Sequence, residues 1–268
     1  NESFRRTAEG LKRLGIWGME LNIKDLDHTS TRDIGAIRSY LAGFGLELSM
    51  FASGLTAKTL GLSLSVVDEA ERERAVAGAR AMIRWVAGTR GQVESRFETP
   101  IGIIVGFLKG GVSPKPDAAR RSLVESLKQL VPDASELGVP LIIEATNRYE
   151  SSVVNSIGEG ISIIDEVTSK GEGRPGALQV LPDTFHMNIE EADMVESMRV
   201  GFEYYTSFHL SDNNRFFPGY GAIDFRKVVA TLDTLGYQGR LAIEGNLRRD
   251  LVSDLSDAVE YLSPFVEV

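Results

Sequence analysis

The chain has 268 residues, of which 43% are hydrophobic and 25% charged, and its formal net charge is -9. This acidic balance argues against nucleic acid as a partner, because a phosphate backbone is bound mainly through Lys and Arg. The sequence has no run of about 18 apolar residues and its first residues do not resemble a signal peptide, so we expect no membrane partner. The absence of cysteine excludes disulfides, thiolate zinc sites and cysteine nucleophiles, and it is consistent with a cytoplasmic protein.

Short apolar runs alternate with helical patterns along the chain. Most runs are continuously apolar, which is typical of strands buried on both faces of a parallel sheet. They predict strands over residues 16–22, 46–53, 99–107, 139–145, 178–183, 205–212 and 240–245. Apolar residues at helical spacing predict helices over residues 4–14, 30–43, 67–87, 116–130, 157–168, 188–200, 222–235 and 250–263. Glycines just before four of the strands are expected to end the preceding helices: Gly15, Gly45, Gly138 and Gly236.

This alternation predicts an α/β protein with a parallel sheet. Eight helices and seven strands nearly complete a (β/α)8 TIM barrel, and no linker or low-complexity segment divides residues 1–268, so we expect one TIM-barrel domain. The pattern opens on a helix, so the first strand is expected to be missing from the chain. An open doubly wound sheet is the alternative, but no GxGxxG motif follows an early strand.

Four chemically capable residues lie at or near the ends of four consecutive predicted strands. They are Glu144, Asp183, His209 and Glu244. In a barrel these ends meet at one rim, where active sites form. Each residue alone is explained as well by a helix cap or an ion pair, but carboxylates that end apolar runs need a partner or a cation. Oxygen ligands with one nitrogen predict a divalent metal site for Mn²⁺, Mg²⁺ or Co²⁺.

The segments around these residues resemble a known family. IEATNRYES, LPDTFHMNIEE, SFHLSDNNRFFPGYGAIDF and LAIEG are similar to motifs of xylose-isomerase-like sugar isomerases and epimerases, above all the ketose (tagatose and psicose) 3-epimerases. The resemblance extends over about residues 67–246. It implies that the four residues bind one metal ion, Mn²⁺ first among the candidates, and that Glu144 and Glu244 are also the catalytic acid/base pair. It further implies substrate contacts for His186, Arg215 and Glu150.

Two positions depart from the family pattern. Ala145 and Thr146 follow Glu144 where relatives commonly have Pro and Leu, and Gly245 and Asn246 follow Glu244 where Ser and Phe are commoner. Both departures lie beside a predicted catalytic glutamate, so the identity of the substrate stays open.

The resemblance implies a sugar substrate and C3 epimerisation of a ketose through a cis-enediolate, since two carboxylates on opposite faces of a carbon can remove and return its proton. Hydroxypyruvate-type or aldose–ketose isomerisation and inosose-type dehydration remain alternatives on the same fold. A DNA-repair endonuclease needs more histidines than the three present, and a non-catalytic sugar-binding protein is the last alternative.

Arg248 and Arg249 are candidate phosphate or carboxylate ligands, or solvent-facing residues. Relatives of this kind also imply a homo-oligomer, a dimer or a tetramer.

Overall fold

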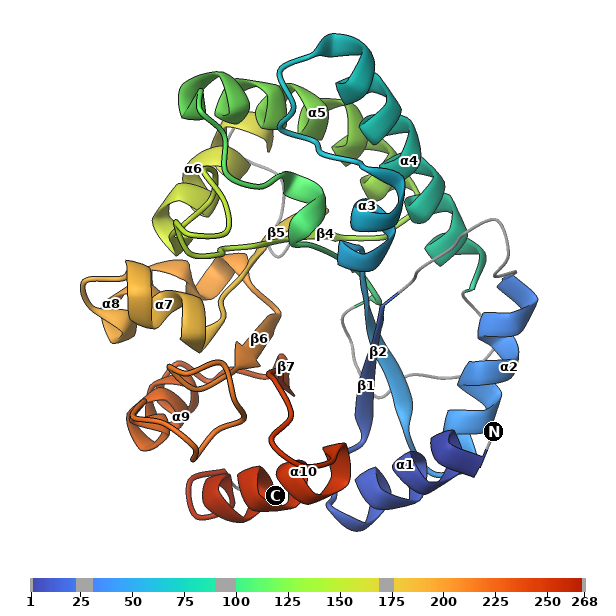
Figure 1. The fold of residues 1–268 in the computed structure, drawn as a ribbon, viewed down its shortest axis with the longest axis vertical. Helices are drawn as coiled ribbons and strands as arrows, with labels where there is room; N and C mark the ends of the chain where they lie inside the picture. Colours follow the sequence, from blue (N-terminus) through green and yellow to red (C-terminus); the bar gives the residue numbers. More distant parts are fainter. Residues whose placement is uncertain (1, 23–30, 90–99, 169–175, 267–268) are drawn as a thin grey trace.

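Parallel strands lie inside a ring of helices in the computed structural model, which describes residues 2–22, 31–89, 100–168 and 176–266 (Figure 1). Within these residues the strands are β1 (Gly18–Asn22), β2 (Glu47–Ala52), β3 (Ile103–Val105), β4 (Leu141–Glu144), β5 (Leu178–Leu181), β6 (Ser207–Leu210) and β7 (Arg240–Ile243). β1 to β5 form one parallel sheet in chain order, and β6 pairs with β7. A parallel bridge between Asp183 and His209 links the two sheets. The α/β barrel prediction is confirmed.

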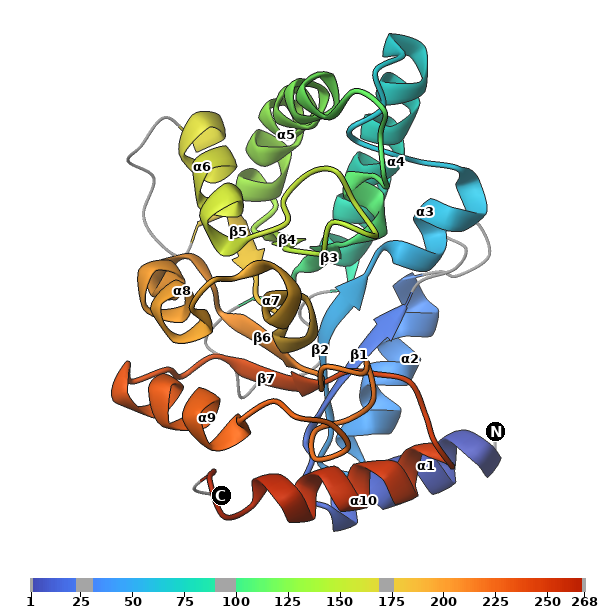
Figure 2. The same cartoon turned by 60° about the vertical axis from the view of Figure 1, so that its left-hand side comes forward.

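The helices cover the outer faces of the strands, as the rotated view shows (Figure 2). They are α1 (Glu2–Arg13), α2 (Thr31–Ala42), α3 (Gly54–Leu60), α4 (Glu69–Gly88), α5 (Pro116–Glu136), α6 (Ile157–Thr168), α7 (Thr184–Glu190), α8 (Met194–Gly201), α9 (Phe225–Thr234) and α10 (Leu251–Leu262), with 3-10 turns η1 (Phe107–Lys109) and η2 (Phe202–Tyr204). In this described part, no helix combines the length and apolar character needed to cross a bilayer.

The core has two parts. A large cluster fills the space between the strands and the surrounding helices, and a small one lies inside the strands, made of Met50, Ile104, Ile142 and Leu181. Residues two apart on a strand share a face. Glu144 therefore follows Ile142 toward the interior, at the carboxyl end of β4. The barrel interior is therefore apolar along the middle of the strands and polar at their carboxyl ends.

The two end strands differ from the rest. β3, β5 and β6 are buried throughout, whereas β1 is half-buried and β7 has an exposed Leu241 at its second position. Within the described residues, β1 pairs with β2 alone and β7 with β6 alone. The barrel is therefore open between β1 and β7 in this part of the chain. The expected additional first strand stays a prediction.

Local differences from the predicted elements have identifiable causes. The helix predicted over 188–200 is two helices, because Asp193 begins α8 by accepting hydrogen bonds from the backbone N–H groups of Val195 and Glu196 at 3.0 and 3.1 Å. The strand predicted over 99–107 is only β3, since a turn at Gly106 leads into η1. The short helix α3 was not predicted. Residues 30 and 99, at the edges of two predicted elements, lie outside the described residues. The four predicted helix-ending glycines all have positive φ, between 59° and 74°.

Candidate functional site

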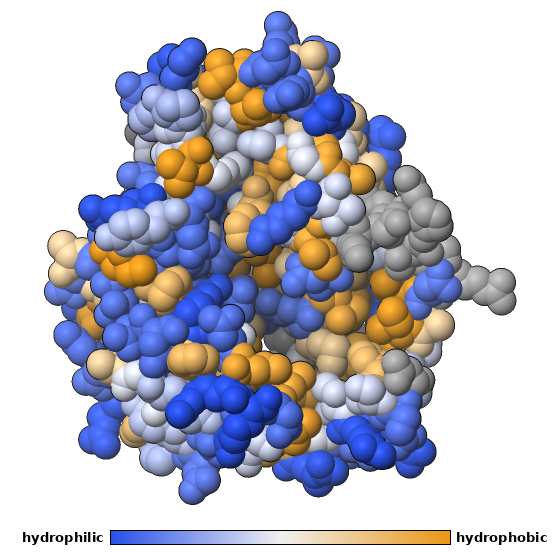
Figure 3. Space-filling model, viewed as in Figure 1, coloured by the Kyte–Doolittle hydropathy of each residue, from blue (hydrophilic) through white to orange (hydrophobic). Residues whose placement is uncertain are grey.

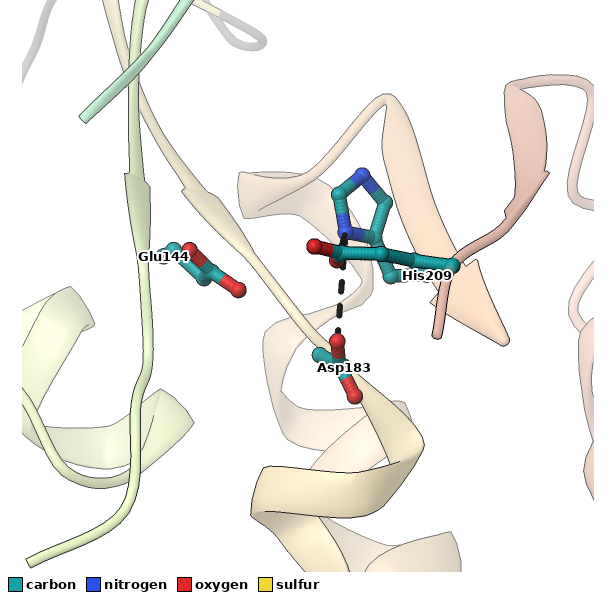
Figure 4. Close-up of side chains that lie close together, drawn as sticks. Glu144, Asp183 and His209 are labelled. Atoms are coloured by element: carbon teal, nitrogen blue, oxygen red, sulfur yellow. Dashed lines mark hydrogen bonds and ion pairs between the residues drawn. The ribbon is translucent and has the colours of Figure 1, made fainter. Parts of the chain in front are cut away.

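The structure brings Glu144, Asp183, His209 and Glu244 together at the carboxyl ends of β4 to β7. One ligand atom from each lies within 4.8 Å of the others. Figure 4 shows the side chains of Glu144, Asp183 and His209 pointing toward one another from three elements. Asp183 and His209 are 0% and 3% exposed, so the cluster is not a solvated acidic surface. The predicted convergence is present; its metal binding stays a prediction.

His209 lies at the centre of the cluster. Its Nδ1 atom is 2.6 Å from Glu244 Oε2 and 3.9 Å from Asp183 Oδ2. Its Nε2 atom is 3.1 Å from Glu20 Oε2, on the other side of the ring. Among the described residues this contact is an ion pair without hydrogen-bond geometry, and it places the Glu20 carboxylate behind the second nitrogen of the ring. The arrangement therefore directs Nδ1 toward the three carboxylates.

Asp183 connects the cluster to the fold. Its Oδ1 atom accepts a hydrogen bond of 2.8 Å from the Phe185 N–H and so caps the start of α7. The next residue, Thr184, fixes the neighbouring loop, because its hydroxyl donates to the Ser211 carbonyl at 2.6 Å and accepts from the Ser211 N–H at 2.8 Å. The helix start thus leaves Oδ2 of Asp183 for the site.

Arg215 bridges two members of the cluster. Its guanidinium contacts Asp183 Oδ2 at 2.5 Å and Glu244 Oε1 at 3.1 Å. The residue has φ of 63°, a left-handed conformation that is uncommon for a non-glycine residue. Buried Asp212 organises this loop by accepting backbone hydrogen bonds from Gly219 and Gly221. The structure therefore places Arg215 against the proposed ligands as well as in the cavity.

His186 is buried beside Glu144, with its Nε2 atom 3.5 Å from Glu144 Oε1. Its Nδ1 atom lies 3.1 Å from the Asn147 N–H and 2.8 Å from the Asn147 side-chain nitrogen. A backbone N–H can only donate, so Nδ1 is an acceptor and carries no proton. His186 is therefore a neutral ring whose Nε2–H faces Glu144 and the cavity.

Glu150 occupies the outer wall. Its Oε1 atom accepts a hydrogen bond of 3.0 Å from the Asn147 side chain, and the residue itself is exposed. It lies in a turn, and the next helix begins only at Ile157, so Glu150 is not a helix cap.

One cavity of about 1150 Å³ joins these groups. Its polar lining includes Lys109, Glu144, Glu150, His186, His209, Arg215 and Glu244. Figure 3 shows the hollow near the centre of the face that carries the carboxyl ends of the strands. Gly106 lies against Glu144, since a Cβ there would be 2.5 Å from Glu144 Oε2. This close approach of the backbone explains why the position is glycine.

The carboxylates of the cluster outnumber the positively charged groups around them. Burial raises the pKa of Asp183 above its usual value, although the Arg215 guanidinium opposes the shift. Burial also favours the neutral form of Glu244, but the charges of His209 and Arg215 outweigh it and hold its pKa below the usual range. Burial lowers the pKa of His209, whereas Glu20 and Glu244 raise it well above its usual value. A divalent cation would displace the proton of His209, because only the neutral imidazole binds a metal, and it would place positive charge beside the three carboxylates.

Sequence reasoning missed three residues of the site: Glu20, Lys109 and Asn147. Glu20 was taken as part of an apolar strand, and its acidic side chain inside the run IWGMELN was the available signal. Lys109 lies in η1, just after the strand that was predicted too long. Asn147 is in the quoted motif IEATNRYES but received no role.

Arg248 and Arg249 lie away from the main cavity lining. Arg249 pairs with Asp254 at 3.0 Å and Asp257 at 2.5 Å, and the Arg248 guanidinium lies 4.6 Å from the centroid of the Tyr220 ring. These acidic partners already occupy Arg249, so its position does not favour a phosphate site.

Comparison with known proteins gives a consistent result. The sequence profile of the family described as "Xylose isomerase-like TIM barrel" matches residues 8–264. A ketose 3-epimerase from Arthrobacter globiformis is 28% identical over 257 residues, covering 95% of this chain and 82% of that protein. A D-psicose 3-epimerase from Enterocloster bolteae is 32% identical over 150 residues, covering 52% of this chain and 48% of that protein. In this second alignment the chain spans about half the length of its relative.

Solved structures show the same fold. The D-psicose 3-epimerase of Clostridium cellulolyticum H10, solved with D-tagatose, superposes with a TM-score of 0.80 at 22% identity, covering 99% of this chain and 94% of that chain. At this identity the likeness establishes the fold alone. The names of the sequence relatives support an enzyme of the isomerase and epimerase class.

Proposed function

Since this chain belongs to the xylose isomerase-like TIM barrel family, we propose that it is a metal-dependent sugar epimerase that inverts C3 of a ketose. The observation that carries the proposal is the pair of glutamates from opposite sides of one cluster. Glu144 ends β4 and Glu244 follows β7, and both line the cavity with the buried Asp183 and His209 between them. The names of the relatives support a sugar as the substrate.

Glu144, Asp183, His209 and Glu244 would hold one divalent ion, for which we propose Mn²⁺. When bound, such an ion polarises the substrate carbonyl and stabilises negative charge on the oxygens beside the reacting carbon. The chain itself prepares this site. Glu20 lies in ion-pair contact with His209 Nε2, and Arg215 orients Asp183 and Glu244.

The two glutamates would share the proton transfer. Glu144, as a carboxylate, removes the C3 proton and becomes a carboxylic acid, while the electron pair moves toward the carbonyl to give an enediolate. For this direction Glu244 must enter protonated, although His209 and Arg215 lower its pKa; it returns a proton to C3 from the other face and becomes a carboxylate, the form that its lowered pKa favours. The reverse reaction exchanges the two roles. Each glutamate has a neighbour that can stabilise its carboxylate form. This neighbour is His186 for Glu144 and Arg215 for Glu244.

His186 and Arg215 would also contact substrate oxygens, with Glu150 at the outer wall. The neutral Nε2–H of His186 faces the cavity as a donor, which suits an oxygen that gains negative charge during the reaction. Arg215 is 23% exposed at its side chain and can donate while it holds the carboxylates.

The experiment that tests this proposal is solvent isotope labelling. The chain is loaded with Mn²⁺ and incubated in D₂O with a panel of ketoses, and the label is located by NMR. Deuterium at C3 together with a new ketose is the expected result. Deuterium at C1 or C2 with an aldose would replace epimerisation by isomerisation. No deuterium in any sugar, with metal binding demonstrated, would contradict the proposal.

A further inference from the structure

Lys109 is a buried cation in the wall of the cavity. It ends η1, the turn that follows β3, and it is 1% exposed. It lines the same cavity as Glu144, Glu150 and His186. The proposed epimerisation uses no such amine, so the presence of Lys109 requires its own explanation.

The ammonium group has few partners. Its Nζ atom lies 2.5 Å from Thr146 Oγ1. In the described part of the chain, no carboxylate oxygen is within 4.0 Å of Nζ. A lysine has three N–H donors, so one hydroxyl leaves donors unfilled. Burial lowers the pKa of Lys109 to about 8, against the opposing influence of Glu144 and Glu150, so the group is still mostly charged at neutral pH. A buried charge with so little compensation is costly unless a ligand completes it.

The backbone around Lys109 is fixed. The Lys109 N–H donates to the Gly106 carbonyl at 3.0 Å, and the Ser151 hydroxyl donates to the Gly110 carbonyl at 2.8 Å. Gly110 has φ of 123°, and a Cβ there would lie 1.9 Å from the Ser65 hydroxyl oxygen. The turn therefore holds the lysine in one place, as a preorganised binding group requires.

Thr146 is fixed as well. Its N–H donates to the Val154 carbonyl at 3.1 Å, and its own carbonyl accepts from the Asn155 side chain at 2.8 Å. It is 6% exposed and lies two residues after Glu144. Lys109 and Thr146 thus form a rigid pair of donors next to a proposed catalytic glutamate.

We propose that Lys109 and Thr146 bind a carboxylate of the substrate, so that the preferred substrate is a ketose acid rather than a neutral ketose. The inference rests on the proposed function, whose substrate class it specifies. A carboxylate carries a single negative charge and accepts several hydrogen bonds, which matches one ammonium and one hydroxyl. A phosphate dianion fits less well, because Glu144 and Glu150 line the same cavity and repel a double negative charge more strongly than a single one.

Equilibrium binding tests this inference directly. The Mn²⁺-loaded chain is titrated by calorimetry with a ketohexose, with the ketose acid that has a carboxylate in place of its terminal CH₂OH, and with the ketohexose 6-phosphate. We expect the acid to bind at least about tenfold more tightly than the other two, the value of one charge-assisted hydrogen bond. No preference for the acid would overturn the inference, and so would a preference for the phosphate.

Variants locate the effect. Lys109→Met keeps the length of the side chain and should abolish the preference for the acid, with Mn²⁺ affinity retained. Thr146→Val should lose a smaller part of the preference, and it carries the test if Lys109→Met does not fold. Lys58→Met removes the same charge from an exposed lysine that also lines the cavity, and it should change acid binding less than about threefold. A preference that survives in Lys109→Met, or that Lys58→Met reduces equally, would contradict the assignment.

Deuterium exchange separates this inference from the proposed function. Tight, Lys109-dependent binding of the acid without exchange at any carbon would overturn the epimerase and keep the carboxylate site. Exchange at C3 that is equal for neutral and acidic ketoses would keep the epimerase and overturn the carboxylate site.

Discussion

The two proposed acid/base glutamates lie on unlike sides of the barrel. Glu144 ends β4, which is paired with strands on both sides, and its side chain is 12% exposed. Glu244 follows β7, whose outer edge has no partner among the described strands, and its side chain is 43% exposed. On the side of β4, which we call the closed side, packing and the nearby Gly106 hold the Glu144 carboxylate. On the side of β7, which we call the open side, the contacts with His209 and Arg215 hold the Glu244 carboxylate.

This difference teaches that one catalytic role can be positioned in two physical ways. A carboxylate confined by neighbouring strands is insensitive to the loss of one polar partner. A carboxylate held mainly by an imidazole and a guanidinium depends on both. Substitution of a polar neighbour should therefore change the function of Glu244 more than that of Glu144. The following variants test the comparison.

The largest effect is expected where the two sides share a function. Glu144→Gln and Glu244→Gln each remove a proposed proton-transfer group while keeping the shape of the side chain. Each should lower kcat by about 10²- to 10⁴-fold. Circular dichroism and Mn²⁺ binding serve as controls for folding and for the metal site. Near-normal turnover in either variant would remove that glutamate from the mechanism.

Arg215→Met should affect Glu244 on the open side and the neighbouring Asp183. Glu244 and Asp183 both lose a cationic partner, while the contact of His186 with Glu144 is kept. We expect Mn²⁺ affinity to fall by about 10- to 100-fold, as for other groups that orient metal ligands. Arg248→Met is the matched control, since Arg248 lies over the Tyr220 ring and contacts no proposed ligand. Equal metal affinity in the two variants would show that Arg215 does not position the ligands.

Asn147→Ala should affect the closed side. The variant removes the side-chain donor to His186 Nδ1 but keeps the backbone donor. The backbone donor still keeps the proton of His186 on Nε2, but the ring loses one of its two donors and is held less firmly, so kcat should fall by roughly tenfold, the value of one hydrogen bond. Imidazole ¹⁵N shifts measure the tautomer. Wild-type shifts that already show a protonated Nδ1 would contradict the proposed role.

The last effect concerns stability rather than turnover. The pKa of Lys109 is lowered from 10.5 to about 8 in the folded chain, so the unfolded chain binds more protons between these values. The free energy of unfolding should therefore rise as the pH increases from about 8 to 10.5. The contribution of Lys109 to it is least favourable below pH 8. Lys109→Met removes the buried charge and should be more stable at pH 7, by about 3 kcal/mol at most, with no such rise. Chemical denaturation at pH 7 and pH 10 measures both effects. A variant less stable than the wild type would indicate a structural lysine.

The sequence allowed the barrel and the four convergent residues to be predicted for one physical reason. Parallel buried strands are nearly continuous apolar runs, and a charged residue that ends such a run stands out. Glu144, Asp183 and Glu244 met this description, and His209 was noticed because the next strand in the series carries it. Arg215 was predicted through a motif as a substrate contact, but its ion pairs with Asp183 and Glu244 depend on a left-handed loop conformation that no local pattern indicated.

The remaining parts of the site depend on contacts between distant segments. Glu20 meets His209 only because β1 reaches the same cavity as β6, and the sequence separation hides that contact. Lys109 faces Thr146 because the turn after β3 returns toward β4, which a strand prediction through residue 107 concealed. Periodicity describes one element at a time, so it cannot report such pairs.

The central claim is that Glu144 and Glu244 act on opposite faces of one carbon. The most direct measurement is the exchange of the C3 hydrogen with D₂O in Glu144→Gln and Glu244→Gln, each supplied separately with both C3 epimers and with bound Mn²⁺ verified. If two bases operate, each variant should exchange the hydrogen of only one epimer, a different one in each variant, without forming the other. Exchange of the same epimer by both variants, or of both epimers by either one, would contradict the two-base account.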